Sequence, residues 1–431
     1  MTGALRIGIA GLGTVGIGVL KIFAAHAAML EARAARPIAI TAVSARNRNR
    51  MRGIDINPFT WFDDPLEMAA SEELDVVVEL IGGSEGIAKD LVETSIANRK
   101  HVVTANKALV ARHGMSLAFA AEANGISLAY EAAVAGGIPI VKALREGLSA
   151  NLVDRLYGIL NGTCNYILTA MTETGRDFSD VLLEAQNLGY AESDPTFDID
   201  GIDTAHKLAI LASVAFGAQV AFERIHVEGI RHISPIDIEF ASELGYGIKL
   251  LGVATRLENG ILNRVHPCMV PNDAPINHVR GVLNGIEVAG DFVDTTIYEG
   301  RGAGAGPTAS AVVADILDIA RDNSVPVFGI PANTLEAIKE LDMDEYRGPY
   351  YIRLTVVDRP GVFADIAAIL RDNQVSMETV VQRVRAPGEP VSVVMTLHES
   401  READVALTLG SIADLETIVE PPRMIRIETL S

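Results

Sequence analysis

The first third of the chain alternates short apolar runs with stretches of helical periodicity, and this alternation limits the possible folds more than any other feature. The apolar runs are rich in Val, Ile and Leu and span residues 5–10, 38–43, 75–80, 101–104 and 126–130. The helical stretches span residues 14–30, 84–97 and 108–123. Apolar strands separated by helices form parallel sheets that are covered on both faces. The sequence therefore predicts an α/β architecture, with a Rossmann-type doubly wound domain over residues 1–130.

Two further domains are predicted beyond residue 130. Gly- and Pro-containing turns interrupt helices and mixed strands over residues 131–306, which indicates an α+β domain. An apolar helix centred on residues 308–321 is expected to return to the first sheet, and we assign residues 307–340 to this helix and the first domain. Residues 341–349 are expected to be a linker. Residues 350–431 follow the order βαββαβ, which predicts a ferredoxin-like domain.

Composition excludes several classes of partner. The 431-residue chain has a formal net charge of −20 and no basic block, whereas nucleic acids and anionic membranes are bound by clustered Lys and Arg. Cys164 and Cys268 are too few for a disulfide framework and are expected to be buried. We find no uninterrupted apolar run of membrane-spanning length and no signal-peptide pattern. A cytoplasmic protein is therefore expected, with no nucleic acid and no membrane as partner.

The first predicted strand is followed by the sequence GLGTVG, which is typical of a dinucleotide-binding loop when a helix comes next. Gly11 permits a tight turn, Gly13 lets the backbone approach a pyrophosphate, and Gly16 lets the helix pack on the strand. The helix N-terminus offers free N–H groups to phosphate. A plain βα turn is the alternative. The expected dinucleotide contacts are Gly11, Leu12, Gly13, Thr14, Val15 and Gly16.

The end of the second strand indicates which dinucleotide is bound. Sites for NAD usually place an acidic residue there to bind the ribose hydroxyl, but this chain has the sequence SARNR at residues 44–48. The guanidinium of Arg46 suits a 2′-phosphate, so NADP(H) is favoured and NAD(H) remains possible. A solvated basic loop is the alternative.

Three further stretches carry polar residues where an active site is expected. The sequence TANK follows a parallel strand, so Thr104 and Lys107 should lie at the carboxyl edge of the sheet, where ligands bind. The sequence GILNGT places Gly162 and Thr163 at a strand-to-helix turn. The third stretch, residues 189–212, contains Glu192, Asp194, Asp198, Asp200, Asp203 and Lys207 ahead of an apolar helix.

Asp203 and Lys207 are four residues apart and share one face of this helix. Such a pair is usually a surface ion pair. Here apolar residues continue the helix, so we expect the charged turn to open into a cleft. A partly desolvated lysine beside a carboxylate is a tunable proton donor.

These motifs resemble homoserine dehydrogenase. The sequences GLGTVG, TANK, EAAVAGGIPI, GILNGT, the 192–207 segment and GRGAGAGPTA occur in the family's order, between Leu5 and about Ala320. The resemblance implies NAD(P)-dependent interconversion of L-homoserine and L-aspartate 4-semialdehyde, on the route to threonine, methionine and isoleucine. It also implies that residues 131–306 bind substrate and form the contacts of a homodimer or homotetramer.

The resemblance also implies roles for individual residues. Lys207 is implied as the general acid/base, with Lys107 able to share that role, and Asp203 as the residue that positions Lys207. Glu192 is implied to bind the substrate ammonium group, while Asp194 and Asp198 either line the acidic pocket or cap turns. The remaining expected contacts are Asp198, Gly162 and Thr163 for substrate, and Thr104, Lys107, Gly189 and Gly304 for the cofactor.

The sequence EAAVAGGIPI at residues 131–140 predicts a site for a hard cation, because it offers only oxygen ligands. In the family that it resembles, this is a sodium site. A Gly turn with Glu131 as a cap is the alternative. The expected ligands are the Glu131 carboxylate and the carbonyl groups of Val134, Gly136 and Ile138.

The DRPGV turn at residues 358–362 and the βαββαβ order resemble an ACT domain, a small-molecule sensor. The resemblance places an amino-acid effector, expected to be L-threonine, near Asp358, Gly361 and Val362. A dimerisation module without ligand is the alternative. Two other functions are possible for the whole chain. A phosphoglycerate dehydrogenase would need a catalytic Arg/Glu/His set, and a non-catalytic dinucleotide sensor would not need the Asp203–Lys207 pair.

Overall fold

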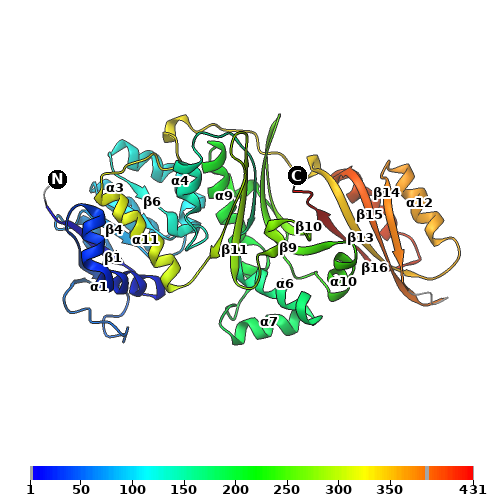
Figure 1. Cartoon of the computed structure of the whole chain (residues 1–431), viewed down its shortest axis with the longest axis horizontal. Coiled ribbons are helices and arrows are strands. Elements are labelled where there is room, and N and C mark those ends of the chain that lie inside the picture. Colours follow the sequence, from blue (N-terminus) through cyan, green and yellow to red (C-terminus); the bar gives the residue numbers. More distant parts are fainter. Residues whose placement is uncertain (1–2, 384–387, 431) are drawn as a thin grey trace.

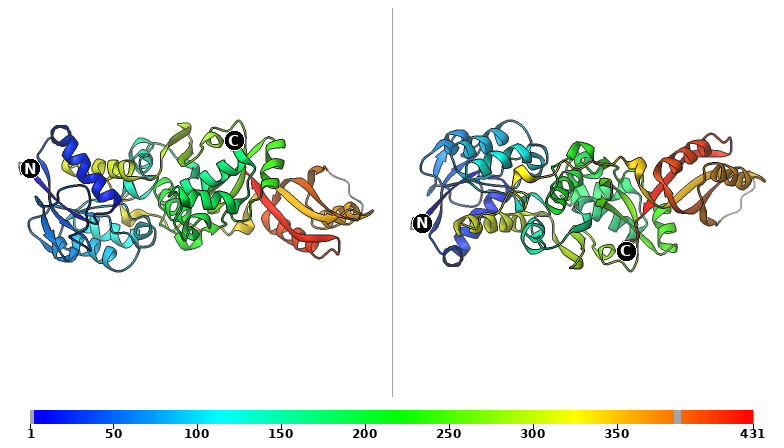
Figure 2. Two further views of the ribbon diagram at one scale, coloured as in Figure 1. Left: turned by 90° about the horizontal axis from the view of Figure 1, so that it is seen from below. Right: turned by 90° about the horizontal axis from the view of Figure 1, so that it is seen from above.

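The computed structural model describes residues 3–383 and 388–430. The chain forms an elongated molecule in which the N-terminal domain and the C-terminal tail lie at opposite ends (Figure 1). The middle part of the sequence lies between them in the view of Figure 1 and in both further views (Figure 2). The fold class predicted from the sequence is confirmed.

The N-terminal domain is built on a six-stranded parallel sheet with the order β3-β2-β1-β4-β5-β6. Chain order reverses between β1 and β4, and ligands of such sheets bind at the carboxyl ends of the strands at this point. The strands are β1 (Leu5–Ala10), β2 (Ile38–Ser44), β3 (Thr60–Phe62), β4 (Val76–Glu79), β5 (His101–Thr104) and β6 (Leu128–Ala129).

Alternate residues of these strands pack on opposite faces of the sheet. Ile7, Ile9 and Val78 join a core with α1 (Thr14–Ala34) and α11 (Ala305–Ala320). Ala10 and Val77 join a second core on the other face, beneath α2 (Pro65–Ala70) and α3 (Ile87–Ala97). Helix α4 (Lys107–Ala123) begins three residues after β5 ends.

By length and composition alone, α1 is long and apolar enough to cross a membrane. Lys21 and Glu31 interrupt its apolar residues, in agreement with the expectation of no uninterrupted apolar run of this length. The structure accounts for the apolar residues, because Gly18, Val19 and Leu20 are buried and Gly18 lies directly against α11. A Cβ atom on Gly18 would lie 2.7 Å from the carbonyl oxygen of Ala305.

The prediction that residues 307–340 form one helix is wrong beyond residue 320. Helix α11 returns to the first domain as expected but ends at Ala320, and Pro326 and Pro331 prevent its continuation. Residues 321–340 are not α-helical and contain a 3₁₀ turn at Ala332–Thr334. Tyr130 donates its hydroxyl to the Val327 carbonyl at 2.7 Å, so this segment is packed against the first domain.

The middle domain has a sheet with the order β12-β11-β7-β9-β10. Its strands are β7 (Val153–Ile159), β9 (Tyr246–Leu257), β10 (Gly260–Pro271), β11 (Leu283–Gly290) and β12 (Asp294–Arg301), and β8 (His226–Val227) pairs with β10. The helices are α5 (Ile140–Lys142), α6 (Gly162–Thr174), α7 (Phe178–Asn187), α8 (Thr196–Ile199), α9 (Ile202–Phe216) and α10 (Pro235–Glu243). Nearly every residue of α9 is buried, including its charged residues, so this helix crosses the interior of the domain.

The tail has the predicted βαββαβ order and a sheet with the order β16-β13-β15-β14. Its elements are β13 (Arg347–Val357), α12 (Val362–Asp372), β14 (Met377–Gln382), β15 (Pro390–Arg401), α13 (Glu402–Ala413) and β16 (Ile418–Ile427). Strand β16 pairs in parallel with β10, with Cys268 opposite Arg426, so the middle and tail sheets are continuous.

The predicted linker at 341–349 is an ordered connection. Leu341 and Tyr346 are buried, and β13 begins at Arg347, inside the range predicted as linker. The guanidinium of Arg264 lies over the Tyr346 ring, 4.5 Å from its centroid. Aromatic packing on a middle-domain side chain therefore fixes this segment.

Candidate active site

The candidate active site is centred on Asp203, which lies between two lysines. Lys107 Nζ is 2.6 Å from Asp203 Oδ1, and Lys207 Nζ is 2.7 Å from Asp203 Oδ2. Lys107 is the first residue of α4, at the carboxyl edge of the parallel sheet, whereas Asp203 and Lys207 share one face of α9. The structure thus brings the three predicted catalytic residues together.

Burial and mutual attraction set the protonation of this group. Burial alone would raise the pKa of Asp203, but the two ammonium groups outweigh it and hold that pKa well below its ordinary value. Burial lowers the pKa of Lys207; Asp203 opposes this shift and the positive charge of Lys107 adds to it. For Lys107, burial is outweighed by Asp203, so its pKa is raised. Lys207 is therefore the lysine that loses its proton more readily.

Two groups from the turn before α6 complete this arrangement, and the sequence analysis missed both. The carbonyl oxygen of Leu160 accepts a hydrogen bond from Lys207 Nζ at 2.6 Å. The side-chain nitrogen of Asn161 donates to Asp203 Oδ2 at 2.9 Å and to Asp198 Oδ1 at 2.8 Å. Asn161 also caps α6, because its side-chain oxygen accepts from Cys164 N. Asparagine before a helix is a recognisable capping signal, and it marks this residue in the sequence.

Residues predicted to bind substrate lie around the same centre. Thr163 Oγ1 donates to the Tyr190 carbonyl at 2.7 Å and lies 3.4 Å from Asp198 Oδ2. Burial, together with the charge of Asp203, raises the pKa of Asp198. Gly162 begins α6, where a Cβ atom would lie 2.8 Å from the Val282 carbonyl oxygen. These groups form a partly buried cluster beside Lys107 and Lys207, with Asp198 and Asp203 as its carboxylates.

Glu192 and Asp194 differ in their surroundings. Both are exposed, but Glu192 is close enough to Lys107 to contribute to its raised pKa. Asp194 accepts a hydrogen bond from Thr196 N at 3.1 Å, which is the turn-capping alternative. Phe197, which the sequence analysis did not single out, places its ring 5.6 Å from Lys107 Nζ.

The dinucleotide-binding loop borders a cavity of about 400 Å³ at the edge of the first sheet. Gly11 has φ +104°, and a Cβ atom there would lie 2.4 Å from the Leu80 carbonyl oxygen. A Cβ atom on Gly16 would lie 2.1 Å from the Gly11 carbonyl oxygen, so both positions require glycine. Thr14 and Val15 form the first turn of α1. The cavity is lined by, among others, Gly11, Leu12, Gly13, Ser44, Arg46, Asn47, Arg50 and Arg52.

A buried network fixes the carboxyl ends of β4 and β5. Glu79 Oε1 accepts from the backbone N–H groups of Ile81 and Gly82, at 2.7 and 2.9 Å. Thr104 donates its hydroxyl to Glu79 Oε2 at 2.5 Å and accepts from Asn106 N. The predicted residue Thr104 therefore shapes the loop that leads into Lys107, and Glu79 was missed.

Gly189 and Gly304 both have positive φ, +74° and +119°, at the ends of helices. Gly189 follows α7 and Gly304 precedes α11, so each lies in a turn that a side chain would strain. Their predicted contact with the cofactor stays a prediction.

The predicted cation ligands lie at the junction of the first and middle domains. Glu131 is buried, and its two oxygens accept hydrogen bonds from Val141 N at 3.0 Å and Lys142 N at 2.8 Å. Burial and the neighbouring Asp315 raise the pKa of Glu131 to about 7. The capping alternative is thus present in the structure, and sodium binding stays a prediction. Val134 and Ile138 are buried, and Gly136 has φ +45°.

The predicted effector residues lie at the start of α12. Gly361 has φ +99° and precedes the helix, and Val362 is its buried first residue. Asp358 N donates to the Glu389 carbonyl at 2.9 Å, which holds the turn against the residue before β15.

One cluster of potential metal ligands lies outside these sites. His266, Cys268 and Glu428 present ligand atoms within 4.8 Å of one another, although the sequence analysis predicted no such site. Glu428 already accepts a hydrogen bond from Arg264 at 2.7 Å, and burial together with Arg426 and Arg264 holds the pKa of His266 well below its ordinary value. A cation there would meet two guanidinium groups, so we interpret the cluster as part of the tail junction.

Comparisons with known proteins agree with this geometry. The family model for homoserine dehydrogenase matches residues 139–317, that for the homoserine dehydrogenase NAD binding domain matches residues 11–131, and that for the ACT domain matches residues 350–417. The homoserine dehydrogenase of Pseudomonas aeruginosa is 44% identical over 434 residues, covering 99% of each chain. That of Helicobacter pylori is 43% identical over 424 residues, covering 98% of this chain and 99% of its own.

Solved structures show the same fold over the whole chain. A homoserine dehydrogenase from Thiobacillus denitrificans superposes with a TM-score of 0.95 at 45% identity and covers 100% of both chains. The enzyme from S. aureus has a TM-score of 0.78 at 28% identity and covers 99% of both. The resemblance inferred from the motifs is confirmed. The chain belongs to the homoserine dehydrogenase family, with an NAD(P)-binding Rossmann domain, a catalytic domain and a C-terminal ACT domain.

Proposed function

We propose that this chain interconverts L-homoserine and L-aspartate 4-semialdehyde, with Lys207 as the proton donor and acceptor. The observation that carries the proposal is the Lys107–Asp203–Lys207 group beside Asp198 and Thr163, at the carboxyl edge of the nucleotide-binding sheet. It supports the proposal because Lys107 lies at the carboxyl edge of the sheet, where dinucleotides bind in folds of this type.

The geometry around Lys207 suits transfer of a proton to or from an oxygen atom. Two of the three N–H bonds of its ammonium group are used by the Leu160 carbonyl and Asp203. The third is available to the substrate oxygen. In the oxidative direction neutral Lys207 removes the hydroxyl proton, and in the reverse direction its ammonium form protonates the oxygen. A bound nicotinamide supplies the chemistry of accepting or delivering the hydride.

We assign Glu192 and Asp198 to the substrate ammonium group, and Gly162 and Thr163 to the pocket wall. Burial and the charge of Asp203 raise the pKa of Asp198, and a bound ammonium group would oppose this shift. The test is a nicotinamide absorbance assay that compares L-homoserine with serine, malate and 3-phosphoglycerate, each with NAD and NADP. Turnover of 3-phosphoglycerate in preference to L-homoserine would overturn the assignment.

For the cofactor we propose a preference for NADP(H), with NAD(H) also used. Arg46 and Arg50 line the dinucleotide cavity, where a 2′-phosphate would need a cation. A hyperthermophilic archaeal homoserine dehydrogenase, 25% identical over 75% of this chain, has been solved in complex with NADPH. We also propose a sodium site at Glu131, Val134, Gly136 and Ile138, for which the buried Glu131 carboxylate and the backbone bend at Gly136 are the support.

For the tail we propose binding of L-threonine near Asp358, Gly361 and Val362, with feedback inhibition of the threonine, methionine and isoleucine route. The ACT family match supports a small-molecule sensor in general. We further propose a homodimer or homotetramer formed through residues 131–306. A cytoplasmic location is proposed because both cysteines are free and buried.

A further inference from the structure

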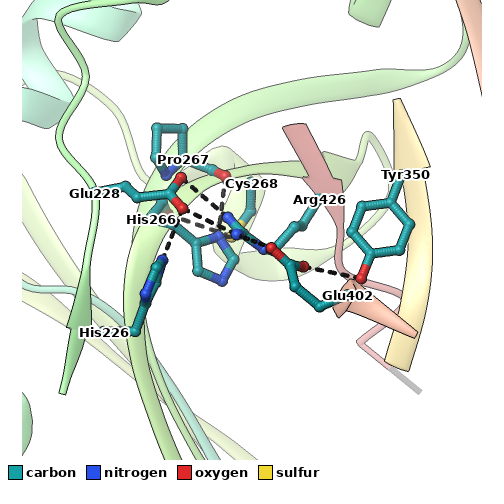
Figure 3. Close-up of polar contacts among 8 residues, drawn as sticks. All are labelled: His226, Glu228, His266, Pro267, Cys268, Tyr350, Glu402 and Arg426. Carbon is teal, nitrogen blue, oxygen red and sulfur yellow. Dashed lines mark hydrogen bonds and ion pairs between the residues drawn. The ribbon is translucent and has the colours of Figure 1, made fainter. Parts of the chain in front are cut away.

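Arg426 is a buried arginine that links the tail to the middle domain. Arg426, on β16, is 2% exposed and lies between two carboxylates (Figure 3). It donates to Glu402 within the tail, with Nε 3.0 Å from Oε2. It also donates to both oxygens of Glu228 in the middle domain, at 3.0 and 2.9 Å. Tyr350 donates its hydroxyl to Glu402 at 2.9 Å, so a second residue of the tail orients the carboxylate that Arg426 binds.

The Glu228 loop is in turn locked to the segment before α9. Ile230 N donates to the Ile199 carbonyl at 2.9 Å, and Glu228 N donates to the Val265 carbonyl at 2.7 Å. A Cβ atom on Gly229 would lie 2.2 Å from the Ile199 carbonyl oxygen and 2.5 Å from the Asp200 Cα atom. The two backbones are therefore in close contact, with no room for a side chain between them, and the Ile230–Ile199 hydrogen bond joins the Glu228 loop to residues 199–201.

That segment carries the active-site groups at both of its ends. Asp198 precedes it and bonds to Asn161, and Asp203 follows it and binds both lysines. A Cβ atom on Gly201 would also lie 3.1 Å from a methyl group of Val227. A continuous series of bonded or touching groups therefore runs from Arg426 to Asp203.

We propose that the Arg426–Glu228 ion pair is a positioning pair for the dehydrogenase reaction, through which the tail holds the Asp198–Asp203 segment in its active arrangement. The inference rests on the proposed active site. Neither residue touches the reacting atoms. The pair also gives a ligand-induced movement of the tail a direct path to the catalytic carboxylates.

The chain offers a matched control at a second buried contact between the tail and the middle domain. Arg353, on β13, donates to Asp237 Oδ1 at 2.7 Å, and the Tyr351 hydroxyl donates to the same oxygen at 3.1 Å. Asp237 belongs to α10 and its capping box, not to the loop against residues 199–201. Both contacts between the tail and the middle domain contain a buried arginine. Of the two, only the Arg426 contact leads to the segment that carries Asp198 and Asp203.

The experiment compares Glu228→Ala, Glu228→Gln, Arg426→Gln and the double variant with Arg353→Gln as control. Glu228→Ala is the main variant, because the Glu228 side chain is 41% exposed and its loss leaves Arg426 paired with Glu402. We expect KM for L-homoserine to rise about 2- to 30-fold, the usual range for coupling through residue networks. The Kd for NADPH, measured by fluorescence, should stay within about two-fold, since that site lies in the other domain.

Three further results are expected. Glu228→Gln keeps a hydrogen-bond acceptor and should restore part of the KM. The effects of Glu228→Ala and Arg426→Gln should be non-additive, because they remove the same pair. Arg353→Gln should lower Tm but leave KM for L-homoserine near the parent value.

The inference is overturned if folded Glu228→Ala has the parent KM and kcat, or if Arg353→Gln raises KM as much as Arg426→Gln does. A parent enzyme that is inactive on L-homoserine would overturn the proposed function and this inference together. An active parent with an unaffected Glu228→Ala variant would overturn the inference alone.

Discussion

Lys107 and Asp203 form a 2.6 Å ion pair between helices of two different domains. Lys107 begins α4 of the nucleotide-binding domain, and Asp203 lies on α9 of the middle domain. The Lys107–Asp203–Lys207 group is therefore complete only when the two domains are in contact. The charge of Asp203 raises the pKa of Lys107 across this domain contact.

Loss of Lys207 should abolish most of the catalysis without affecting cofactor binding. Lys207→Ala is expected to lower kcat by about two to four powers of ten, the usual contribution of a general acid/base. Glu192→Gln should instead raise KM for L-homoserine. Steady-state kinetics and NADPH binding by fluorescence check both. A Lys207→Ala enzyme with near-parent kcat would move the proton role to Lys107.

The pH dependence of oxidation should report the pKa of Lys207, because oxidation needs the neutral amine. The rate should rise with pH through that pKa, which burial holds below its ordinary value. Asp203 raises this pKa, so Asp203→Asn should move the rising limb to lower pH. Lys107 lowers it, so Lys107→Met should move the limb to higher pH. The midpoint of the rising limb is expected to shift by about 1–3 pH units in each variant. Identical pH–rate curves for the parent, Asp203→Asn and Lys107→Met would contradict the assignment of this limb to Lys207.

Arg46 should determine the choice of dinucleotide. Arg46→Ala is expected to weaken NADP binding by about 1.5–3 kcal/mol, for the loss of a charge-assisted hydrogen bond, and to change NAD binding little. Arg48→Ala is the control, because its guanidinium lies 5.8 Å from the Trp61 ring centroid. The measurement is kcat/KM for both cofactors. An equal loss of kcat/KM for NADP in Arg46→Ala and Arg48→Ala would indicate that the loop attracts the cofactor only through its general positive charge.

Stability should fall as pH rises through the pKa of the Glu131 carboxyl. Burial and Asp315 raise that pKa from 4.5 to about 7, so the folded protein binds this proton more tightly than the unfolded chain does. The resulting stabilisation is full below pH 4.5 and is lost as pH rises through about 7. Each tenfold difference in proton affinity between the folded and unfolded states corresponds to about 1.4 kcal/mol. Denaturant unfolding over this pH range is the measurement, and Glu131→Gln should remove the part of the pH dependence that this carboxyl contributes.

A sodium ion beside Glu131 would favour the charged carboxylate, so sodium should raise Tm of the parent at about pH 7.5, above the pKa of this group, and not that of Glu131→Gln. Choline chloride at the same ionic strength is the control. If Tm of the parent is the same in both salts, Glu131 acts only as a backbone cap.

Gly361→Asp should abolish inhibition by L-threonine and leave catalysis intact. The backbone there has φ +99°, so any side chain is strained, and Gly361→Ala separates this strain from the added charge. Inhibition curves should show loss of inhibition with Asp and retention of most of it with Ala. Equal inhibition in parent and Gly361→Asp would place the effector elsewhere.

Local patterns predicted most of the fold and the centre of the site. Strands β1 and β5 match their predicted ranges, and the i,i+4 spacing of Asp203 and Lys207 indicated a shared helix face. Contacts between distant segments could not be predicted. Asn161 meets Asp198 and Asp203 only through the fold, and Arg426 meets Glu228 across 198 positions of the sequence. Helix α11 ends at Ala320, whereas the prediction extended it to residue 340. Pro326 and Pro331 could have indicated from the sequence that the helix does not continue.

The pairing of β16 with β10 makes the tail a cover for an edge strand. Without residues 348–431, β10 would keep its pairing with β9 but would lose its partner strand at Cys268 and Met269 on the other side. Arg264 would also lose Glu428, to which it donates at 2.7 Å. Exposed strand edges promote association with other chains. We therefore expect deletion of the tail to promote aggregation, so the proposed inhibition is better tested by substitutions within the tail than by truncation.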